Sequence, residues 1–245
     1  MFLSIITVVR NGADVIGPTI ESVNAQTFRD FEHLVIDGLS NDGTSEVVNR
    51  LANKENLRFY SGKDSGIYDA MNKGLDMATG DYVLFLNAGD RLHSPDALET
   101  VARLARENNI PGIIYGQTDI VDQNGNYLGP RHLSAPKELT LSSFREGMLV
   151  CHQAFYALRK LVGRYDLKYR FSSDYDWCIR ALQHSNNNVY ADAVLADYLN
   201  EGATTKNRFK SLRERASIMA QYYGVVPTLF RHIGFAFRAL KRRLK

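Results

Sequence analysis

The fold is decided by Leu3-Ser4-Ile5-Ile6-Thr7-Val8-Val9, a mostly β-branched run that is followed by Arg10-Asn11. Apolar residues at successive positions are typical of a strand that is buried on both faces of a parallel sheet. A helical pattern follows from about residue 14 to 26. Strand-like and helical stretches keep alternating up to about residue 90, which indicates right-handed βαβ units. The sequence therefore predicts an α/β fold around a mostly parallel sheet flanked by helices.

The same patterns extend along the rest of the chain, less regularly after residue 90. Strands are predicted at 31–36, 57–60, 82–86, 113–116 and 154–158, and helices at 44–53, 66–78, 95–108 and 174–183. Asp42-Gly43-Thr44 has the composition of a helix start. Neither an internal repeat nor a Pro/Gly/Ser-rich linker interrupts the chain, so we expect one continuous domain with a C-terminal helical extension.

Polar residues gather where the first four predicted strands end. These segments are Arg10-Asn11, Asp37-Gly38, Lys63-Asp64 and Asn87-Ala88-Gly89-Asp90. In open α/β sheets the carboxyl ends of the strands converge on the ligand. A carboxylate such as Asp37 can accept hydrogen bonds from a base or a ribose, although it could also cap only the following turn. Four polar strand ends on one edge favour a binding site.

Composition and short motifs exclude several classes. The 245 residues are 44% hydrophobic and 23% charged, as in folded globular domains. The glycine-rich motifs of dinucleotide-binding domains and of phosphate-loop NTPases do not follow any predicted strand, and Gly-x-Ser-x-Gly is also missing. Cys151 and Cys178 lack the spacing of a zinc site. No apolar run approaches the roughly 18 residues of a spanning helix, and residues after Met1 lack a signal-peptide pattern. We therefore expect a cytoplasmic protein.

Charge is distributed unevenly. Residues 206–245 hold eleven Lys and Arg but one acid, Glu214, which gives this segment +10, whereas the whole chain carries +3. The last fifteen residues mix aromatic and aliphatic side chains with a basic cluster, a composition that suits a helix lying on an anionic membrane surface. A solvated helix that packs on the domain is the alternative. No nucleic-acid-binding signature accompanies the tail, so we expect no nucleic-acid partner.

Several blocks in order resemble glycosyltransferase family 2. They are Ser4-Ile5-Ile6-Thr7-Val8-Val9-Arg10-Asn11, Gln26-Thr27-Phe28, Val35-Ile36-Asp37-Gly38-Leu39-Ser40-Asn41-Asp42-Gly43-Thr44 and the fourth-strand segment. Asp64-Ser65-Gly66-Ile67-Tyr68-Asp69-Ala70-Met71-Asn72-Lys73-Gly74 and Ser172-Ser173-Asp174-Tyr175-Asp176 are similar to the colanic-acid type of bacterial exopolysaccharide enzyme. The likeness covers about residues 1–205.

The resemblance implies a GT-A fold and an activity. Residues 1–205 would form the glycosyltransferase domain, with a nucleotide-sugar half at 1–90 and an acceptor half at 91–205, and 206–245 would be the basic helical extension. The expected reaction is the metal-dependent, inverting transfer of a hexosyl or deoxyhexosyl unit from a nucleoside-diphosphate sugar. The acceptor would be a saccharide, expected to be lipid-linked, at the inner face of the cell membrane.

Site residues follow from the same resemblance. The residues assigned to binding the donor nucleotide are Thr7, Val8, Arg10, Asp37, Asp64, Tyr68, Asn72 and Asn87. Asp174 is assigned as the general base, and His152 and Gln153 are assigned to the acceptor. Asp90 is assigned as the ligand of Mn²⁺ or Mg²⁺. Arg10 or a basic residue of the C-terminal segment would neutralise the diphosphate. Glu201-Gly202-Ala203-Thr204-Thr205 resembles a segment that closes over the donor.

Several of these residues could instead have a purely structural role. Asp174 could be a helix N-cap, Asp90 could bond local backbone, and His152 could be a hydrogen-bonded structural group. Asp176 is expected to be structural, and Asp69 with Lys73 a solvated pair. Gly38 stands where the family usually has a second Asp, and Asn87 opens the segment where it often has Asp-x-Asp. These departures keep open a catalytically impaired sugar-nucleotide-binding protein, and a sugar nucleotidyltransferase is a further alternative.

Overall fold

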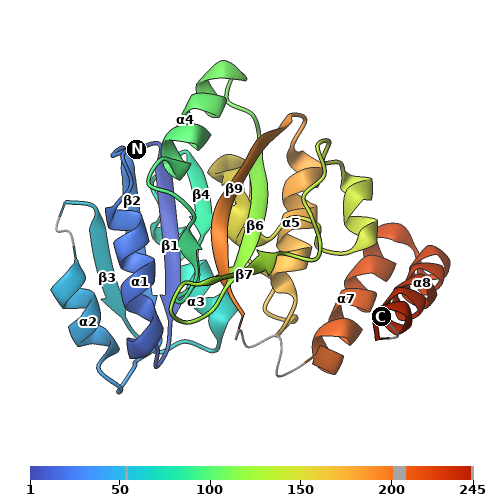
Figure 1. Cartoon of the computed structure of the whole chain (residues 1–245), viewed down its shortest axis with the longest axis horizontal. Coiled ribbons are helices and arrows are strands. Elements are labelled where there is room, and N and C mark those ends of the chain that lie inside the picture. Colours follow the sequence, from blue (N-terminus) through green and yellow to red (C-terminus); the bar gives the residue numbers. More distant parts are fainter. Residues whose placement is uncertain (53–54, 201–207, 244–245) are drawn as a thin grey trace.

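The computed structural model describes residues 1–52, 55–200 and 208–243 (Figure 1). Its strands are β1 (Leu3–Val9), β2 (Phe31–Asp37), β3 (Leu57–Ser61), β4 (Tyr82–Phe85), β5 (Arg91–Leu92), β6 (Ile113–Val121), β7 (Tyr127–Pro130), β8 (Phe155–Leu158) and β9 (Asn188–Leu199). Its α-helices are α1 (Ala13–Asn24), α2 (Thr44–Leu51), α3 (Ile67–Met77), α4 (Ala97–Glu107), α5 (Ser173–His184), α7 (Arg208–Tyr223) and α8 (Val225–Arg243). Three 3₁₀ turns are η1 (Leu141–Glu146), η2 (His152–Ala154) and η3 (Arg159–Leu161).

The described strands form one nine-stranded sheet in the order β3-β2-β1-β4-β8-β6-β9-β5, with β7 added beside β6. β1 pairs in parallel with β2 and β4, and β2 with β3, so the predicted parallel half is confirmed. The chain moves outward from β1 to β3 and returns to β4 on the other side of β1. This reversal of strand order is where open α/β sheets bind ligands.

β1 lies in the middle of this half and is buried along its whole length, as predicted. Ile6 and Val8 belong to the core on the side of α3 and α5, whereas Leu3 and Ile5 belong to the core on the side of α4. The alternation follows from the two-residue repeat of a strand. Helices therefore cover both faces of the sheet, and the strand ends remain as the accessible edge (Figure 1).

The loop after β2 starts α2 in the predicted way. Gly43 adopts a left-handed conformation with φ of 92°, which a glycine tolerates without strain. The Asp42 carboxylate accepts a hydrogen bond from the Thr44 backbone N–H at 3.1 Å and one from the Ala13 N–H at 3.1 Å. Asp42 therefore joins the starts of α1 and α2, and helix-start chemistry at this position is confirmed.

The acceptor half differs from the sequence prediction in its strands. β6 runs to Val121 rather than to residue 116, and the twelve-residue β9 lies where no strand was predicted. The β9 sequence, Asn-Val-Tyr-Ala-Asp-Ala-Val-Leu-Ala-Asp-Tyr-Leu, mixes the strand formers Val and Tyr with Asn, Ala and Asp, which are depleted in strands, and lacks a strict alternation. Parallel pairing with β6 stabilises it, and this long-range contact has no local signal. β8 is antiparallel to β4 and to β6.

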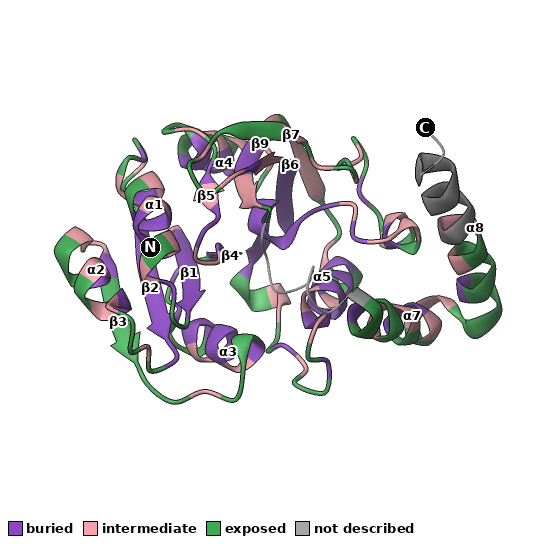
Figure 2. Cartoon of the chain, turned by 60° about the horizontal axis from the view of Figure 1, so that its bottom comes forward, coloured by how far each residue is buried: buried purple, intermediate pink, exposed green. Residues whose placement is uncertain are grey.

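Two helices follow the domain at the C-terminal side. α7 packs against α5 and buries Ile218 and Met219, while α8 extends away with largely exposed residues (Figure 2). None of the described helices combines the length and apolarity that crossing a membrane requires. The expected lid at 201–205 and the predicted domain boundary at 205 lie outside the described residues.

Candidate active site

A ring of polar side chains lies at the carboxyl ends of the parallel strands. Asp37 is the last residue of β2, Asp64 stands between β3 and α3, and Asn87 follows β4. Asp174 belongs to the first turn of α5, and His152 begins η2. Segments that are far apart in sequence thus meet at the edge where the sequence predicted a ligand.

Asp37 is fully buried and firmly held. Its Oδ2 accepts hydrogen bonds from the Ser61 hydroxyl at 2.6 Å and from the Ser40 backbone N–H at 3.1 Å, and its Oδ1 is bonded by the Ser40 hydroxyl. These partners fix the carboxylate at the strand end. Asp37 therefore does cap the following turn through Ser40. The lone pairs of its carboxylate that these bonds do not use can still accept hydrogen bonds from a ligand.

Gly38 and Asp64 share one small space. A Cβ placed on Gly38 would lie 2.4 Å from Asp64 Oδ2 and 3.3 Å from Arg10 Cδ. The position of the missing second acid is thus occupied by the Asp64 carboxylate, which reaches in from the β3–α3 loop. Asp64 Oδ1 also accepts a hydrogen bond from the Gly66 N–H at 3.0 Å. Arg10, Asp37 and Asp64 are therefore neighbours, as expected for one nucleotide pocket.

Three of the residues assigned to the donor nucleotide have buried side chains with other roles. The Thr7 hydroxyl lies 2.9 Å from His33 Nε2, and Val8 belongs to the core packed on α3. The amide of Asn72 donates to the Tyr165 carbonyl at 3.0 Å and accepts from the Tyr165 N–H at 2.7 Å. These three side chains are therefore buried and engaged in contacts within the protein.

The expected base lies at the centre of a buried chain of polar contacts. Asp174 Oδ1 accepts a hydrogen bond from the Tyr68 hydroxyl at 3.0 Å, and Asp174 Oδ2 lies 3.4 Å from His152 Nδ1. His152 Nε2 lies 3.2 Å from Asn87 Nδ2. A neutral imidazole with its proton on Nδ1 satisfies both of its contacts, because it donates to Asp174 and accepts from Asn87.

Electrostatics keep Asp174 ionised. Burial raises the pKa of its carboxyl, but His152, Arg215 and Tyr68 together outweigh burial and lower that pKa below its usual value. Burial and the charge of Asp174 raise the pKa of Tyr68, so the Tyr68 hydroxyl stays protonated and donates. A carboxylate with 14% of its side chain exposed, charged at neutral pH and oriented by two neighbours, can accept a proton from a bound hydroxyl.

Asp90, predicted to bind the metal, does not bond only local backbone, which was the alternative reading. Its Oδ2 accepts a hydrogen bond from Gln153 Nε2 at 2.7 Å, and its Oδ1 accepts one from the Leu199 N–H at 3.0 Å. Burial raises the pKa of Asp90 to about 6. Gln153, predicted for the acceptor, thus orients the residue predicted for the metal.

The donor atoms near Asp90 are compatible with a divalent cation. Asn87 Oδ1, three residues earlier, is buried without a hydrogen-bond partner, and Mg²⁺ and Mn²⁺ bind hard oxygen atoms of this kind. Each Asp90 oxygen retains a lone pair beyond its one hydrogen bond. Asn87 and Asp90, together with phosphate oxygens, fit the ligand set of such an ion.

A second group of metal-ligand side chains lies on the sheet outside this chain of contacts. His93, Asp119 and Asp197 have ligand atoms within 4.8 Å of one another, and in the described ranges no other three His, Cys, Asp or Glu residues do so. His93 Nδ1 already lies 2.7 Å from Asp197 Oδ1. Asp119 lies in the part of β6 beyond the predicted residues 113–116, and Asp197 lies on β9, which was not predicted, so sequence reasoning did not find this group.

Two structural predictions near the site are confirmed. Asp176 accepts hydrogen bonds from Arg180 Nε and from the Tyr222 hydroxyl, both at 2.8 Å. Lys73 Nζ lies 3.2 Å from Asp69 Oδ2, in the expected pair on α3. Asp174 and Asp176 therefore have separate roles, although they are two residues apart.

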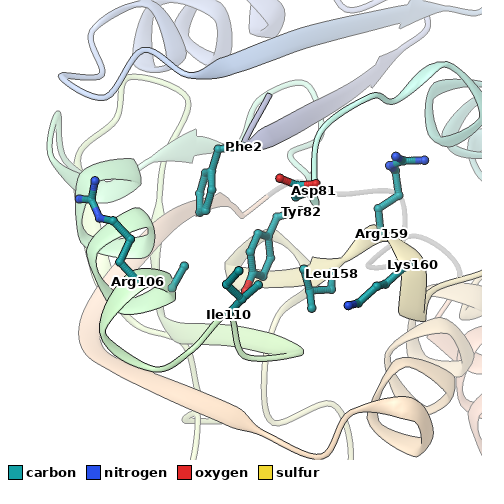
Figure 3. Close-up of a pocket in the computed structure, with 9 residues that line it drawn as sticks. Phe2, Asp81, Tyr82, Arg106, Ile110, Leu158, Arg159 and Lys160 are labelled. Carbon is teal, nitrogen blue, oxygen red and sulfur yellow. The ribbon is translucent and has the colours of Figure 1, made fainter.

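A pocket opens at the opposite end of the parallel strands (Figure 3). It has a volume of about 380 Å³ and is lined by Phe2, Asp81, Tyr82, Ala105, Arg106, Ile110, Leu158, Arg159 and Lys160. Tyr82 begins β4, whereas Asn87 follows its end. This pocket is therefore not part of the site around Asp174.

Acidic side chains at a parallel strand edge, together with the carboxylate oriented on α5, fit the arrangement of a GT-A glycosyltransferase. The chain belongs to glycosyltransferase family 2, because the model of the family described as "Glycosyl transferase family 2" matches residues 4–164. The predicted resemblance is thereby confirmed. The chain is 33% identical over 214 residues to a PGL/p-HBAD biosynthesis glycosyltransferase of Mycobacterium bovis, a match covering 85% of this chain and 78% of that protein.

Further relatives agree with this family. The amylovoran biosynthesis glycosyltransferase AmsB of Erwinia amylovora is 29% identical over 261 residues, with 99% of this chain and 83% of AmsB covered. The crystal structure of S. aureus TarS with UDP-GlcNAc matches with a TM-score of 0.74 and 20% identity, over 96% of this chain and 73% of that one. The mannosyltransferase PcManGT of Pyrobaculum calidifontis, in complex with GDP-Man and Mn²⁺, matches with a TM-score of 0.65 and 16% identity, over 96% and 74%. These two structures share the fold.

Proposed function

We propose that this protein transfers one hexosyl or deoxyhexosyl unit from a nucleoside-diphosphate sugar to a saccharide acceptor in bacterial surface polysaccharide synthesis, with inversion at the anomeric carbon. The observation that carries the proposal is that Asp174 is held by Tyr68, on the helix that follows the Asp64 loop, and by His152. A base and a nucleotide pocket on one strand edge are what such a transfer needs.

The proposed reaction is a single displacement. Asp174 takes the proton of the acceptor hydroxyl, whose oxygen forms a bond to the anomeric carbon from the side opposite the diphosphate. The bond from that carbon to the diphosphate oxygen breaks, and its electron pair leaves with the diphosphate. The lowered pKa of Asp174 keeps it deprotonated, and the acceptor hydroxyl becomes acidic only as its oxygen bonds to carbon. His152 and Tyr68 hold the carboxylate for this step.

A divalent cation, Mn²⁺ or Mg²⁺, is part of the proposal. Asp90, with Asn87 Oδ1 beside it, would hold the ion, and its charge would offset that of the diphosphate. PcManGT in complex with GDP-Man and Mn²⁺ supports this assignment by its shared fold. Gln153 and the Leu199 N–H keep the Asp90 carboxylate in one orientation.

The acceptor is proposed to be lipid-linked, with the protein on the cytoplasmic face of the membrane. α8 carries an apolar face, defined here as Val225, Val226, Leu229, Phe230 and Ile233, whose residues are 47–71% exposed (Figure 2). Four of these residues, 226 to 233, repeat at helical spacing, and the basic cluster of residues 238–245 follows them in sequence. An apolar face beside basic residues suits an anionic lipid surface.

A catalytically impaired sugar-nucleotide-binding protein is the second candidate, favoured by Gly38 and by Asn87 in place of an acid. The space at Gly38 is, however, filled by the Asp64 carboxylate, so the pocket retains two acids. The intact contacts of Asp174 also favour an enzyme over a binding protein.

A panel of UDP-, GDP- and dTDP-sugars tests the donor site. Thermal stabilisation of the purified protein is measured with and without Mn²⁺, for the wild type, Asp37→Ala and the surface control Asp76→Ala, whose carboxylate is half exposed and lies 3.5 Å from Arg164. We expect one nucleotide class to stabilise the wild type and the control but not Asp37→Ala. Release of the nucleoside diphosphate in the presence of a lipid-linked oligosaccharide fraction then tests transfer. Stabilisation without any release would favour the impaired protein.

A further inference from the structure

α7 is fixed against the start of α5 by hydrogen bonds along one of its faces. The partners are Ser211 with Ser172 at 3.0 Å, the Glu214 carboxylate with the Arg170 and Phe171 N–H groups at 2.9 and 2.7 Å, and Tyr222 with Asp176 at 2.8 Å. Ser172 and Asp176 stand on either side of Asp174 in sequence. The position of α7 relative to Asp174 is therefore set by direct contacts.

Arg215 belongs to the same face of α7. It comes four residues after Ser211 and three before Ile218, both of which are buried, so helical spacing turns Arg215 toward the domain. Its Nε is buried, and in the ranges 1–52, 55–200 and 208–243 it has no hydrogen-bond partner. Its guanidinium also forms no ion pair within 4.0 Å in those ranges, although its charge acts on Asp174 and Tyr68.

A guanidinium in this place that has no partner among the described residues is unusual for a residue with only a structural role. Arginine stays charged at all working pH values, and burying one of its donors without a partner is unfavourable. The neighbouring Glu214 does not compensate for it, because both Glu214 oxygens accept backbone hydrogen bonds from the segment before α5. Arg215 is thus a cation without a partner in the part of the chain that the structure describes, and its planar donors match the oxygens of a phosphate.

The location points to one particular phosphate group. Tyr68 and Asp174 mark one place, because the Tyr68 hydroxyl donates to Asp174 Oδ1 at 3.0 Å. Asp174 is the proposed base and would lie beside the reacting sugar carbon, to which the diphosphate of the donor is bonded. A cation whose charge acts on both Tyr68 and Asp174 is therefore beside the path of the diphosphate.

We propose that Arg215 binds the diphosphate of the donor and stabilises it as the leaving group. This inference rests on the proposed function and assigns to one residue of the C-terminal extension a role in the reaction. When the bond between the sugar carbon and the diphosphate oxygen breaks, the electron pair remains on that oxygen, and the guanidinium hydrogen bonds offset the added charge. The extension then completes the donor site in addition to any contact with a membrane.

Calorimetric binding with matched probes tests the proposal. UDP, GDP and dTDP are titrated in the presence of Mn²⁺, next to uridine, guanosine and thymidine, which lack the diphosphate. The variants are Arg215→Ala and Arg215→Lys, and the control is Arg213→Ala, an exposed arginine on the same helix. Circular dichroism and thermal unfolding establish that each variant is folded, and Arg215→Gln replaces Arg215→Ala if that variant does not fold.

We expect Arg215→Ala to weaken binding of the recognised nucleoside diphosphate at least tenfold while its nucleoside binds as in the wild type. Arg215→Lys should recover part of the loss, and Arg213→Ala should stay within about twofold of the wild type. Unchanged diphosphate affinity in Arg215→Ala overturns the proposal, including the case in which only the KM for the acceptor rises. A wild type that binds none of the three nucleotides contradicts the proposed function itself, before any variant is compared.

Discussion

His152 Nδ1 lies 3.4 Å from Asp174 Oδ2, and the other nitrogen of the same ring faces Asn87. Three separate elements meet through this one imidazole: η2, the first turn of α5 and the loop that follows β4. Because Gln153, the next residue, orients Asp90, the short η2 turn positions both acids of the proposed reaction. The two carboxylates are thus coupled through adjacent residues of the same turn.

Replacing Asp174 by Asn should abolish transfer and leave donor binding intact. The amide keeps the size of the carboxylate but cannot accept the acceptor's proton, so we expect kcat to fall by about 10²- to 10⁴-fold. Nucleotide-sugar affinity, measured calorimetrically, should change by less than about threefold. Asp176→Asn is the control for a neighbouring carboxylate, which bonds Arg180 and Tyr222 instead. A variant that retains near wild-type kcat would remove Asp174 from the mechanism.

Replacing Gly38 by Ala should weaken nucleotide binding with little loss of stability. The new Cβ would lie 2.4 Å from Asp64 Oδ2, and this short side chain can turn away, so we expect the free energy of unfolding to fall by less than about 1 kcal/mol. The displaced carboxylate no longer lies in the nucleotide pocket. Gly62→Ala is the control, because a Cβ there meets no atom within 4 Å. Equal nucleotide affinity in both variants would contradict a role for Asp64.

Stability should fall in mild acid because of His33. Burial lowers the pKa of His33 to about 3 from an unfolded value of 6.5, so only the unfolded chain gains this proton as the pH drops below 6.5. Stability from this group is complete above pH 6.5 and is lost as the pH falls, by about 2 kcal/mol between pH 7.5 and 5.0.

Urea unfolding at these two pH values checks the expectation. A His33→Gln variant keeps a side chain able to bond Thr7 but has no proton to gain, so its stability should decrease less than that of the wild type. The comparison cancels the other titrating groups, which both proteins share. Parallel pH dependence in the two proteins would show that His33 is not buried in its neutral form.

Disrupting the apolar face of α8 should reduce binding to anionic vesicles. Leu229 and Phe230 are 61% and 70% exposed, and a double change to Asp removes apolar area and adds negative charge on the proposed lipid-facing side. The affinity for vesicles containing phosphatidylglycerol, measured by sedimentation, should fall at least tenfold. The control is Tyr127→Asp, because Tyr127 is an aromatic residue of the domain that is 63% exposed; this variant should bind as the wild type does. Equal binding of all three proteins would argue that another surface contacts the lipid.

Much of the site follows from residues that are close in sequence. The run Leu3–Val9 is buried on both faces because its apolar residues are consecutive, and Asp42 starts α2 because its carboxylate bonds the Thr44 N–H two residues away. Local signals of this kind predicted the parallel half of the sheet and the edge where Asp37, Asp64 and Asn87 meet. They also identified the family, because several short sequence blocks typical of it occur in order along the chain.

Other features depend on contacts between distant segments. β9 exists because β6 pairs with it, and no period in its own sequence predicts it. The amide of Asn72 is used by the Tyr165 backbone, and Asp90 is bonded by Gln153 and by the Leu199 N–H, which sequence spacing does not reveal. Tyr68, which the resemblance assigned to the nucleotide, donates its hydroxyl to Asp174 across 106 positions of the chain.

The sequence by itself determined the parallel sheet, the strand edge that carries the site and the membership in glycosyltransferase family 2. These depend on hydrophobic periodicity and on short polar blocks, which act over a few residues. Only the tertiary structure decided which neighbours each polar side chain has: Asp174 contacts His152 and Tyr68, Asp64 occupies the space beside Gly38, and the charge of Arg215 acts on Asp174. The physical reason is that hydrogen bonds and charge interactions depend on distances in space, and folding sets those distances through packing of residues far apart in the chain.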